Sequence, residues 1–341
     1  MTLWLARYSG LTDARILTLA LMLVFAITAL PGSRAHATQT ASPVVGAEGG
    51  ALYTFDSGEA GFFTKTYFYD TGSEVVAFDA QFTPELAEQA IAFLREQTDN
   101  PITYLVLTHP NPDKFNGAPV FQDEGAEVIA SEATEAAIPG VHAYKKAGFV
   151  GMGMFTEETY PQQATVDETF SGAHTLELED GKTVELSELS EPGVSSTQTA
   201  AFLPELNALI VGDLVHHKLH AWLEGGIIDG QATPTIDGWI TDLQELETTF
   251  AGDPEPTVYG GRGEPAPLSE AVADQIAYLE RADQIVTDYV AGLGDKQSEL
   301  SSDQAGEHYA AIQAELAEAF PDYAFPDMIS FSVYGLVNSK R

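Results

Sequence analysis

A group of polar side chains follows a strongly apolar segment early in the chain. Residues 102–108 (ITYLVLT) form a nearly continuous apolar run, which predicts a strand covered on both faces. The residues that follow include His109, Asn111, Asp113 and Lys114. Loops that follow strands often carry functional residues, and His and Asp can bind a metal ion or move a proton. This loop is therefore the first candidate site.

A second group of such residues lies about one hundred positions later. Asp213 is followed by His216, His217 and His220 in the pattern H-H-x-x-H. Histidines three or four positions apart can share a metal ion when they lie on a helix. We expect His216 and His217 to be packed or surface residues. His220 has two open interpretations, a metal ligand or acid–base group on one side and a packed residue beside Trp222 on the other.

The remaining sequence predicts the elements that must position these residues. Helical spacing of apolar residues, with Thr83 as a cap and Pro84 in the first turn, predicts a helix after position 83. Further helices are expected at 118–124, 238–250, 268–293 and 309–320, and strands at 62–69, 74–79, 127–130, 175–178, 183–189, 199–203, 208–211 and 257–259. Residues 145–160 show no period and predict a mobile flap. Two strand-rich halves, each closed by helices, indicate an α/β or α+β protein.

Five motifs in order resemble those of the metallo-β-lactamase superfamily. The loop at 108–117 resembles the H-x-H-x-D-H signature, and residues 62–79 resemble the opening hairpin that ends in Asp. Residues 191–195, 208–213 and 259–263 correspond to the family's Gly-His-Thr turn, Gly-Asp strand end and Gly-His-Gly strand end. The resemblance covers roughly residues 52–291. It implies an α+β fold, a four-layer αββα sandwich, with the site along one edge of two sheets.

The chain departs from the family at most of the metal ligands. In the family, three His hold a first zinc and Asp, His and His hold a second, with the Gly-Asp carboxylate between them. Carried over by position, the chain keeps His109, Asp113 and Asp213, which would be the ligands if an ion binds. The other four ligand positions hold Asn111, Lys114, Val194 and Arg262. One weakly held zinc, iron or manganese ion is the most that the resemblance implies, and no cofactor is firmly indicated.

Two of these replacements bring positive charge to the second metal position. Ammonium and guanidinium groups have no lone pair to donate to a metal ion. Two buried carboxylates without a cation would be costly, so Lys114 and Arg262 can supply the two positive charges that a zinc ion would bring. We therefore hypothesise that these residues form a charge network with Asp113 and Asp213. The alternative is unrelated drift in a decayed site.

Two functions fit this interpretation. The first is a hydrolase acting on a small ester, lactone, amide or phosphoester, with water activated by His109 or Asp113 and the acyl oxygen polarised by Lys114 and Arg262. The resemblance places the segment after Gly-Asp at the mouth of the site, so His220 joins these catalytic candidates. Substrate-binding roles are expected for two further residues, Asn111 and Trp222. The second function is non-catalytic binding of a small anion in a pocket formed by Lys114 and Arg262.

Composition limits the partners of the protein. The chain has 15 Lys+Arg against 51 Asp+Glu, a net charge of −36, and no cysteine. Nucleic acid is excluded as a partner because its phosphates would be repelled by this negative charge. Disulfides and thiolate metal sites are excluded because the chain has no cysteine. A small-molecule substrate or anion is the expected partner, and a homodimer is compatible with the sequence.

The N-terminal residues predict export. Two arginines precede a 15-residue apolar run at 16–30, too short to span a bilayer, and Ala35-His36-Ala37 offers a cleavage site. We expect a signal peptide at 1–37, a flexible leader at 38–50, the metallo-β-lactamase-like domain at 51–293 and a helical extension at 294–341 that packs on it. The mature protein is expected in a bacterial periplasm, without stable membrane insertion.

Overall fold

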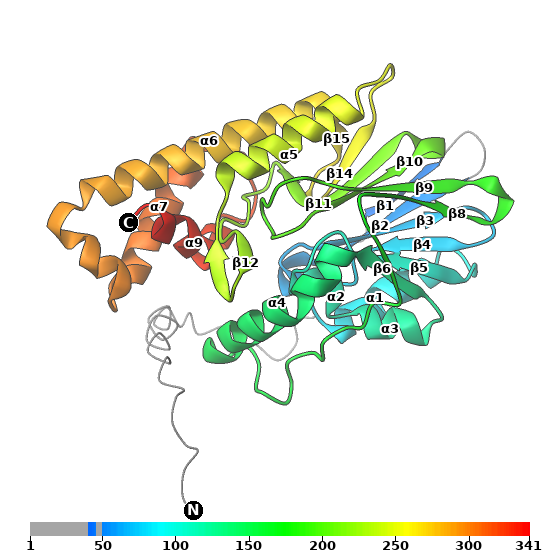
Figure 1. Cartoon of the computed structure of the whole chain (residues 1–341), viewed down its shortest axis with the longest axis horizontal. Coiled ribbons are helices and arrows are strands. Elements are labelled where there is room, and N and C mark those ends of the chain that lie inside the picture. Colours follow the sequence, from blue (N-terminus) through cyan, green and yellow to red (C-terminus); the bar gives the residue numbers. More distant parts are fainter. Residues whose placement is uncertain (1–39, 46–49) are drawn as a thin grey trace, which may run out of the picture.

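Two β-sheets form the centre of the computed structural model, which describes residues 40–45 and 50–341 (Figure 1). Within these residues the first sheet has the strand order β1 to β7, antiparallel from β1 to β4 and parallel from β4 to β7. Its strands are β1 (Thr40–Val45), β2 (Ala51–Asp56), β3 (Lys65–Asp70), β4 (Val75–Phe78), β5 (Ile102–Val106), β6 (Glu127–Ser131) and β7 (Glu168–Phe170).

The second sheet has the order β15-β14-β11-β10-β9-β8. All its neighbours are antiparallel except β11 and β14, which run parallel. Its strands are β8 (Ala173–Glu177), β9 (Thr183–Glu188), β10 (Thr199–Leu203), β11 (Ala208–His217), β14 (Thr257–Gly263) and β15 (Ala266–Pro267). A separate hairpin consists of β12 (Gly226–Ile228) and β13 (Gln231–Thr233).

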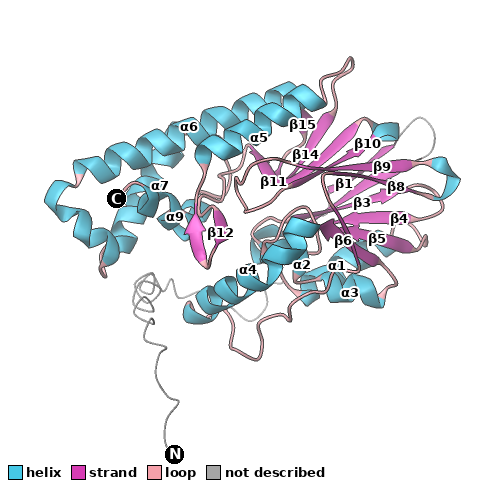
Figure 2. Cartoon of the chain, viewed as in Figure 1, coloured by secondary structure: helices cyan, strands magenta, loops and turns pink. Residues whose placement is uncertain are grey.

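Helices cover the outer face of each sheet (Figure 2). On the first sheet lie α1 (Pro84–Arg95), α2 (Pro112–Phe115), α3 (Ala118–Asp123) and α4 (Glu132–Gly151). On the second lie α5 (Ile236–Thr249) and α6 (Leu268–Gly292). The last three helices, α7 (Ala305–Ala319), α8 (Asp327–Ser332) and α9 (Tyr334–Ser339), lie beyond the edge of the sheets, where α7 and α9 pack against α6. The layers are therefore helix, sheet, sheet and helix, which confirms the expected α+β sandwich.

Successive side chains along a strand point to opposite faces of its sheet, so each strand contributes both to the core between the sheets and to the core under the helices. On β3, Tyr67 and Tyr69 point between the sheets, whereas Phe68 points outward to α3. On β11, Ile210 joins the inter-sheet core and its neighbour Leu209 joins the helical layer on the other side. A strand whose two faces are both covered must be apolar at successive positions, which explains the apolar run over β5.

Sequence signals at the start of α1 are confirmed. Thr83 is the N-cap residue, and its Oγ1 accepts a hydrogen bond from the backbone N–H of Leu86 at 3.3 Å. Pro84 follows at the first helical position, where its missing N–H has no cost. The helix buries Ala90, Phe93 and Leu94 of the predicted stripe.

Two expectations about irregular segments were wrong. The expected mobile flap at 145–160 begins inside α4, which continues to Gly151 despite Pro139 and several glycines. These residues weaken the helical pattern, but the buried side chains of Ile138, Val141 and Phe149 secure the helix. The expected flexible leader also contains β1, which pairs with β2 at the edge of the first sheet.

The C-terminal segment packs on the second helical layer. Ile312 and Leu316 of α7 and Leu336 of α9 share one apolar core with Leu279 of α6. No helix in the described part of the chain is long and apolar enough to cross a membrane. The predicted signal peptide at 1–37 lies outside the described residues.

Candidate functional site

Four charged side chains meet at one end of the two sheets. Asp113 and Lys114 lie on the short helix α2, which follows β5 by way of His109. Asp213 lies within β11 and Arg262 within β14. The parallel pairing of β11 with β14 brings the last two together, although 49 positions separate them in the sequence.

Lys114 lies among three carboxylates. Its Nζ is 2.8 Å from Oδ1 of Asp213, 2.9 Å from Oδ2 of Asp113 and 3.7 Å from Oδ2 of Asp79. The lysine side chain is completely buried, so no water competes for its ammonium group. Its position between the two carboxylates is where a bridging cation would lie.

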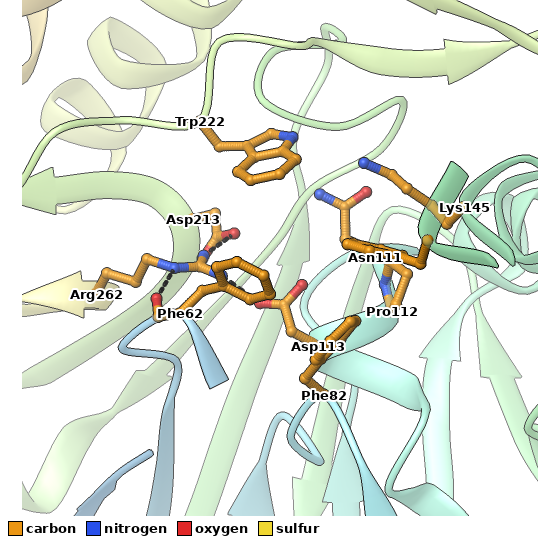
Figure 3. Close-up of a pocket in the computed structure, with 10 residues that line it drawn as sticks. Phe62, Phe82, Asn111, Pro112, Asp113, Lys145, Asp213, Trp222 and Arg262 are labelled. Carbon is orange, nitrogen blue, oxygen red and sulfur yellow. Dashed lines mark hydrogen bonds and ion pairs between the residues drawn. The ribbon is translucent and has the colours of Figure 1, made fainter. Parts of the chain in front are cut away.

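Arg262 binds the same two carboxylates (Figure 3). Its Nη1 contacts Asp213, and its Nη2 donates to Oδ2 of Asp113 at 2.9 Å and to Oγ1 of Thr64 at 3.0 Å. Its Nε donates to the carbonyl oxygen of Phe62 at 2.8 Å, so the guanidinium is held on three sides. The expected charge network is therefore the arrangement that the structure contains.

Two glycines permit this close approach. A Cβ at Gly261 would lie 2.1 Å from Oδ1 of Asp213, so any larger residue would displace the carboxylate. A Cβ at Gly212 would lie 2.2 Å from Oγ1 of Thr108, and its φ of +51° is one that glycine adopts at little cost. The glycines beside Asp213 and Arg262 are thus needed by the site itself.

Mutual pairing sets the charge states. Burial by itself would raise the pKa of Asp113 and of Asp213, but Lys114 and Arg262 outweigh it and bring both values below the usual range. Burial likewise opposes the charge of Lys114 and Arg262, and the carboxylates reverse this and raise both pKa values. At neutral pH the two carboxylates are therefore deprotonated and the two cations are protonated, so all four groups are charged.

Asp79 and His109 complete the buried cluster. Asp79 ends the opening hairpin and accepts hydrogen bonds from the backbone N–H and Oγ1 of Thr108, both at 2.9 Å. Burial raises the pKa of Asp79 in spite of the nearby Lys114. His109 is fully buried with its Nε2 3.5 Å from Oδ2 of Asp213, and neither ring nitrogen has a hydrogen-bond partner among the described residues.

These residues do not fit the two-zinc arrangement of the family that the sequence resembles. Both carboxylate oxygens of Asp213 and Oδ2 of Asp113 are already bound to Lys114 and Arg262, whose nitrogen atoms cannot serve as ligands. His109 and Asp213 alone provide fewer than the three protein ligands that zinc sites usually have. Among the residues that the structure describes, the one group of three potential ligands within mutual reach is elsewhere, at His217, Glu270 and Asp274.

A small pocket opens above the charge network. Aromatic residues form much of its wall, and the lining comprises Phe62, Phe82, Asn111, Pro112, Asp113, Lys145, Phe149, Asp213, Trp222 and Arg262. The space that the centre of a water molecule can reach inside it is about 20 Å³, enough for about one water. A larger ligand therefore requires the wall to move. The expected substrate-binding residues Asn111 and Trp222 do face this pocket (Figure 3).

Trp222 is held over the pocket by a second charged pair that the sequence did not reveal. Its Nε1 donates to Oε2 of Glu224 at 2.8 Å, and the same carboxylate is bound to the buried Lys145 of α4. The Lys145 ammonium lies 4.9 Å from the centroid of the Trp222 ring, and Tyr334 donates to Glu224 from α9. Every cation that lines the pocket is thus paired with a carboxylate.

The structure does not bring His220 into this group. Its Nδ1 lies 3.1 Å from the hydroxyl of Tyr278 on α6, and its ring packs against Tyr278 and Tyr323. Burial lowers the pKa of His220 to about 4, so the ring is neutral. His216 is also a packed residue, buried against Trp239, as expected. The metal or acid–base role considered for His220 is therefore not supported by its position.

Comparisons with known proteins agree with this fold. The profile of the Metallo-beta-lactamase superfamily matches residues 60–262, which is more than half of the chain. A metallo-beta-lactamase from Pontibacter korlensis superimposes with a TM-score of 0.52 at 19% identity, covering 72% of this chain and 98% of that one. The structure of TMB-1 gives a TM-score of 0.49 at 18% identity over 71% of this chain and 97% of that one. No curated protein sequence matches the chain.

The chain belongs to the metallo-β-lactamase superfamily. Members of this superfamily are generally hydrolases that bind zinc. At such low identity the solved structures establish the fold alone. What this chain does must therefore be argued from its own site.

Proposed function

We propose that this protein is a ligand-binding member of its superfamily whose pocket holds no metal ion. The observation that carries the proposal is the position of Lys114. Its ammonium lies 2.8 and 2.9 Å from Asp213 and Asp113, the two carboxylates that flank the second metal position of the family. Arg262 is paired with the same two carboxylates. Lys114 and Arg262 therefore neutralise the two carboxylates as a metal ion would, but they cannot act as a Lewis acid.

The pKa directions argue against acid–base chemistry on this network. A general base works best when its pKa lies near the ambient pH. Asp113 and Asp213 have lowered pKa values and are weak bases, whereas Lys114 and Arg262 have raised values and are weak acids. None of the four is suited to take a proton from water and later return it.

The pocket wall indicates the class of ligand. Phe62, Phe82 and Trp222 present apolar surface, while Asn111 and the paired charges below offer hydrogen bonds without unpaired charge. We therefore favour a small neutral molecule with an apolar body and one polar end, such as an amide, alcohol or lactone. The small-anion ligand considered from the sequence is less favoured, because Asp113 and Asp213 already neutralise Lys114 and Arg262.

Metal-independent hydrolysis is the second candidate, and one observation favours it. His109 lies 3.5 Å from Asp213 with its ring nitrogens unpartnered among the described residues, and a His–Asp pair can deprotonate water. Turnover of an ester, lactone, amide or phosphoester that resists chelators and is lost in His109→Gln would support this candidate over pure binding.

The test combines metal analysis, turnover and binding. The protein is produced as a His217→Gln variant, so that the group of His217, Glu270 and Asp274 does not contribute to the metal count. With zinc, iron and manganese supplied, it is expected to contain far less than one ion per chain and to show no chelator-sensitive hydrolysis of chromogenic esters, lactones and phosphodiesters. Ligand-observed NMR should detect neutral lactones and amides, and Trp222→Ala should abolish their signals. Binding of carboxylates and phosphates in their place, or zinc-dependent turnover, would contradict the proposal.

Export is a further part of this proposal. The apolar run and Ala35-His36-Ala37 support cleavage after Ala37 and location in a bacterial periplasm. Expression of the full chain in a Gram-negative host is expected to yield periplasmic protein whose intact mass corresponds to a chain starting at Thr38. Retention of residues 1–37 on protein recovered from the cytoplasm would show that the segment is not a signal peptide.

A further inference from the structure

Three potential metal ligands meet outside the pocket, where β11 ends beside the start of α6. The Nε2 of His217 lies 3.3 Å from Oδ2 of Asp274 and 3.6 Å from Oε1 of Glu270. Glu270 and Asp274 are four positions apart on α6, so they share one face of this helix. None of the three residues lines the pocket described above.

The imidazole of His217 is already oriented as a ligand. Its Nδ1 lies 3.2 Å from the carbonyl oxygen of Glu264, and a carbonyl can only accept, so this contact fixes the proton on Nδ1. Nε2 then points toward the two carboxylates, and its lone pair is available to a cation when it carries no proton. The His217 side chain is only 7% exposed, and its Nε2 has no hydrogen-bond partner within the described ranges. Histidine ligands of metal ions typically donate their other nitrogen to a carbonyl or carboxylate in this way.

The distances match a tetrahedral ion. Zinc binds nitrogen and oxygen ligands at about 2.0–2.2 Å, which places neighbouring tetrahedral ligands about 3.3–3.6 Å apart. The observed separations of 3.3 and 3.6 Å fall in that interval. We propose that His217, Glu270 and Asp274 form a zinc-type site for one divalent cation, with a fourth position open to solvent beside the exposed Glu270.

Lys218 is the competitor for this site. Its Nζ contacts Oδ2 of Asp274, but its side chain is 44% exposed and free to rotate into water. The ring of Tyr323, 5.6 Å away, offers the ammonium another favourable position. Entry of a dication therefore displaces a surface ion pair, which is a small cost.

An ion at this site would join two layers of the fold. His217 ends the strand that carries Asp213, and Glu270 lies in the first turn of the long helix that packs on that sheet. Loading would therefore stabilise the β11–α6 junction, and the strong negative charge of the chain would favour cation entry. This inference does not depend on what the pocket binds.

Zinc titration of the tag-free protein tests the site. Isothermal titration calorimetry with ZnCl₂ should show one equivalent bound, and Co²⁺ should give the visible absorption of a tetrahedral ion. Zinc should also raise the melting temperature by several degrees. His217→Gln, Glu270→Gln and Asp274→Asn should each weaken binding at least tenfold, whereas Lys218→Ala should tighten it.

His174→Gln is the matched control, because His174 also lies beside a surface carboxylate, 3.8 Å from Glu168, without a third ligand. Its zinc binding should equal that of the unmodified protein. Melting curves with EDTA show that each variant is folded. The proposal is overturned if the protein binds no zinc, if His217→Gln keeps the bound equivalent, or if His174→Gln loses it to the same extent.

Discussion

Replacement of Lys114 by methionine is expected to lower the free energy of unfolding by about 3–5 kcal/mol at pH 7, because it leaves buried carboxylates without their main counter-charge. Methionine has nearly the same length and fills the same space, so the loss is electrostatic in origin. Lys114 is completely buried and lies within 4 Å of Asp79, Asp113 and Asp213. Arg262 alone cannot balance these three groups.

The pH dependence of this loss gives a sharper test. In the unmodified protein, Asp113 and Asp213 have folded-state pKa values below the usual value near 4, so their contribution is present above about pH 4 and is lost as the pH falls further. Without Lys114, Arg262 is the remaining counter-charge, so we expect the pKa values of both carboxylates to be higher than in the unmodified protein and their protonation at lower pH to relieve the unpaired charge. The stability difference between the two proteins should therefore shrink as the pH falls from 7 to 4.

Urea denaturation followed by circular dichroism at both pH values measures this effect. Lys146→Met is the control, because Lys146 is paired with Glu157 at the surface and its loss should change stability by less than about 1 kcal/mol. A Lys114→Met protein as stable as this control at pH 7 would mean that the charge network contributes no stability.

Restoring two imidazoles is expected to create a zinc site. In the double variant Lys114→His with Arg262→His, both cations give way to the residues that the family has at these positions. Asp113 and Asp213 would then be released as oxygen ligands, and two carboxylates with two imidazoles make a complete four-coordinate set. We expect about one tightly bound zinc ion per chain, compared with almost none in this pocket of the parent.

The matched control replaces the same two residues by glutamine, which removes the cations without adding imidazoles. Elemental analysis after dialysis should find bound zinc in the His variant and none in the Gln variant. His217→Gln is included in every background, so that zinc at the surface site does not contribute to the count. If the His and Gln variants retained the same amount of zinc, Lys114 and Arg262 could not be said to stand in metal positions.

The order of the motifs was sufficient to predict the fold. It also indicated which polar residues lie near one another in the candidate site. The apolar run before His109 and the Gly-Asp pair at Asp213 indicated the strand ends that deliver these residues, and the structure places them together. The pairing of Lys114 and Arg262 with Asp113 and Asp213 was also predicted from the sequence, and the structure contains these ion pairs. Thr64 and Lys145 were missed as site residues, because neither lies in a recognisable motif and each reaches the site only through tertiary packing.

The histidines after Asp213 show the limit of motif reasoning. Spacing alone suggested a shared role for H-H-x-x-H on a helix, but β11 extends through His217, so helical spacing does not apply to these residues. His216 is buried in the core, His217 faces α6, and His220 packs on Tyr278. Whether the segment was strand or helix decided which of them could act together.

The sequence by itself determined the superfamily, because the identity and order of its motifs define it. It also placed Lys114 and Arg262 at positions where the resemblance expects metal-binding histidines. Only the tertiary structure decided that Lys114 and Arg262 are paired with Asp113 and Asp213. The pocket above these pairs therefore carries no unpaired charge. The tertiary structure also decided that His217 meets Glu270 and Asp274. Ion pairing depends on distances of a few ångströms between atoms far apart in the chain, and the packing of sheets and helices sets those distances.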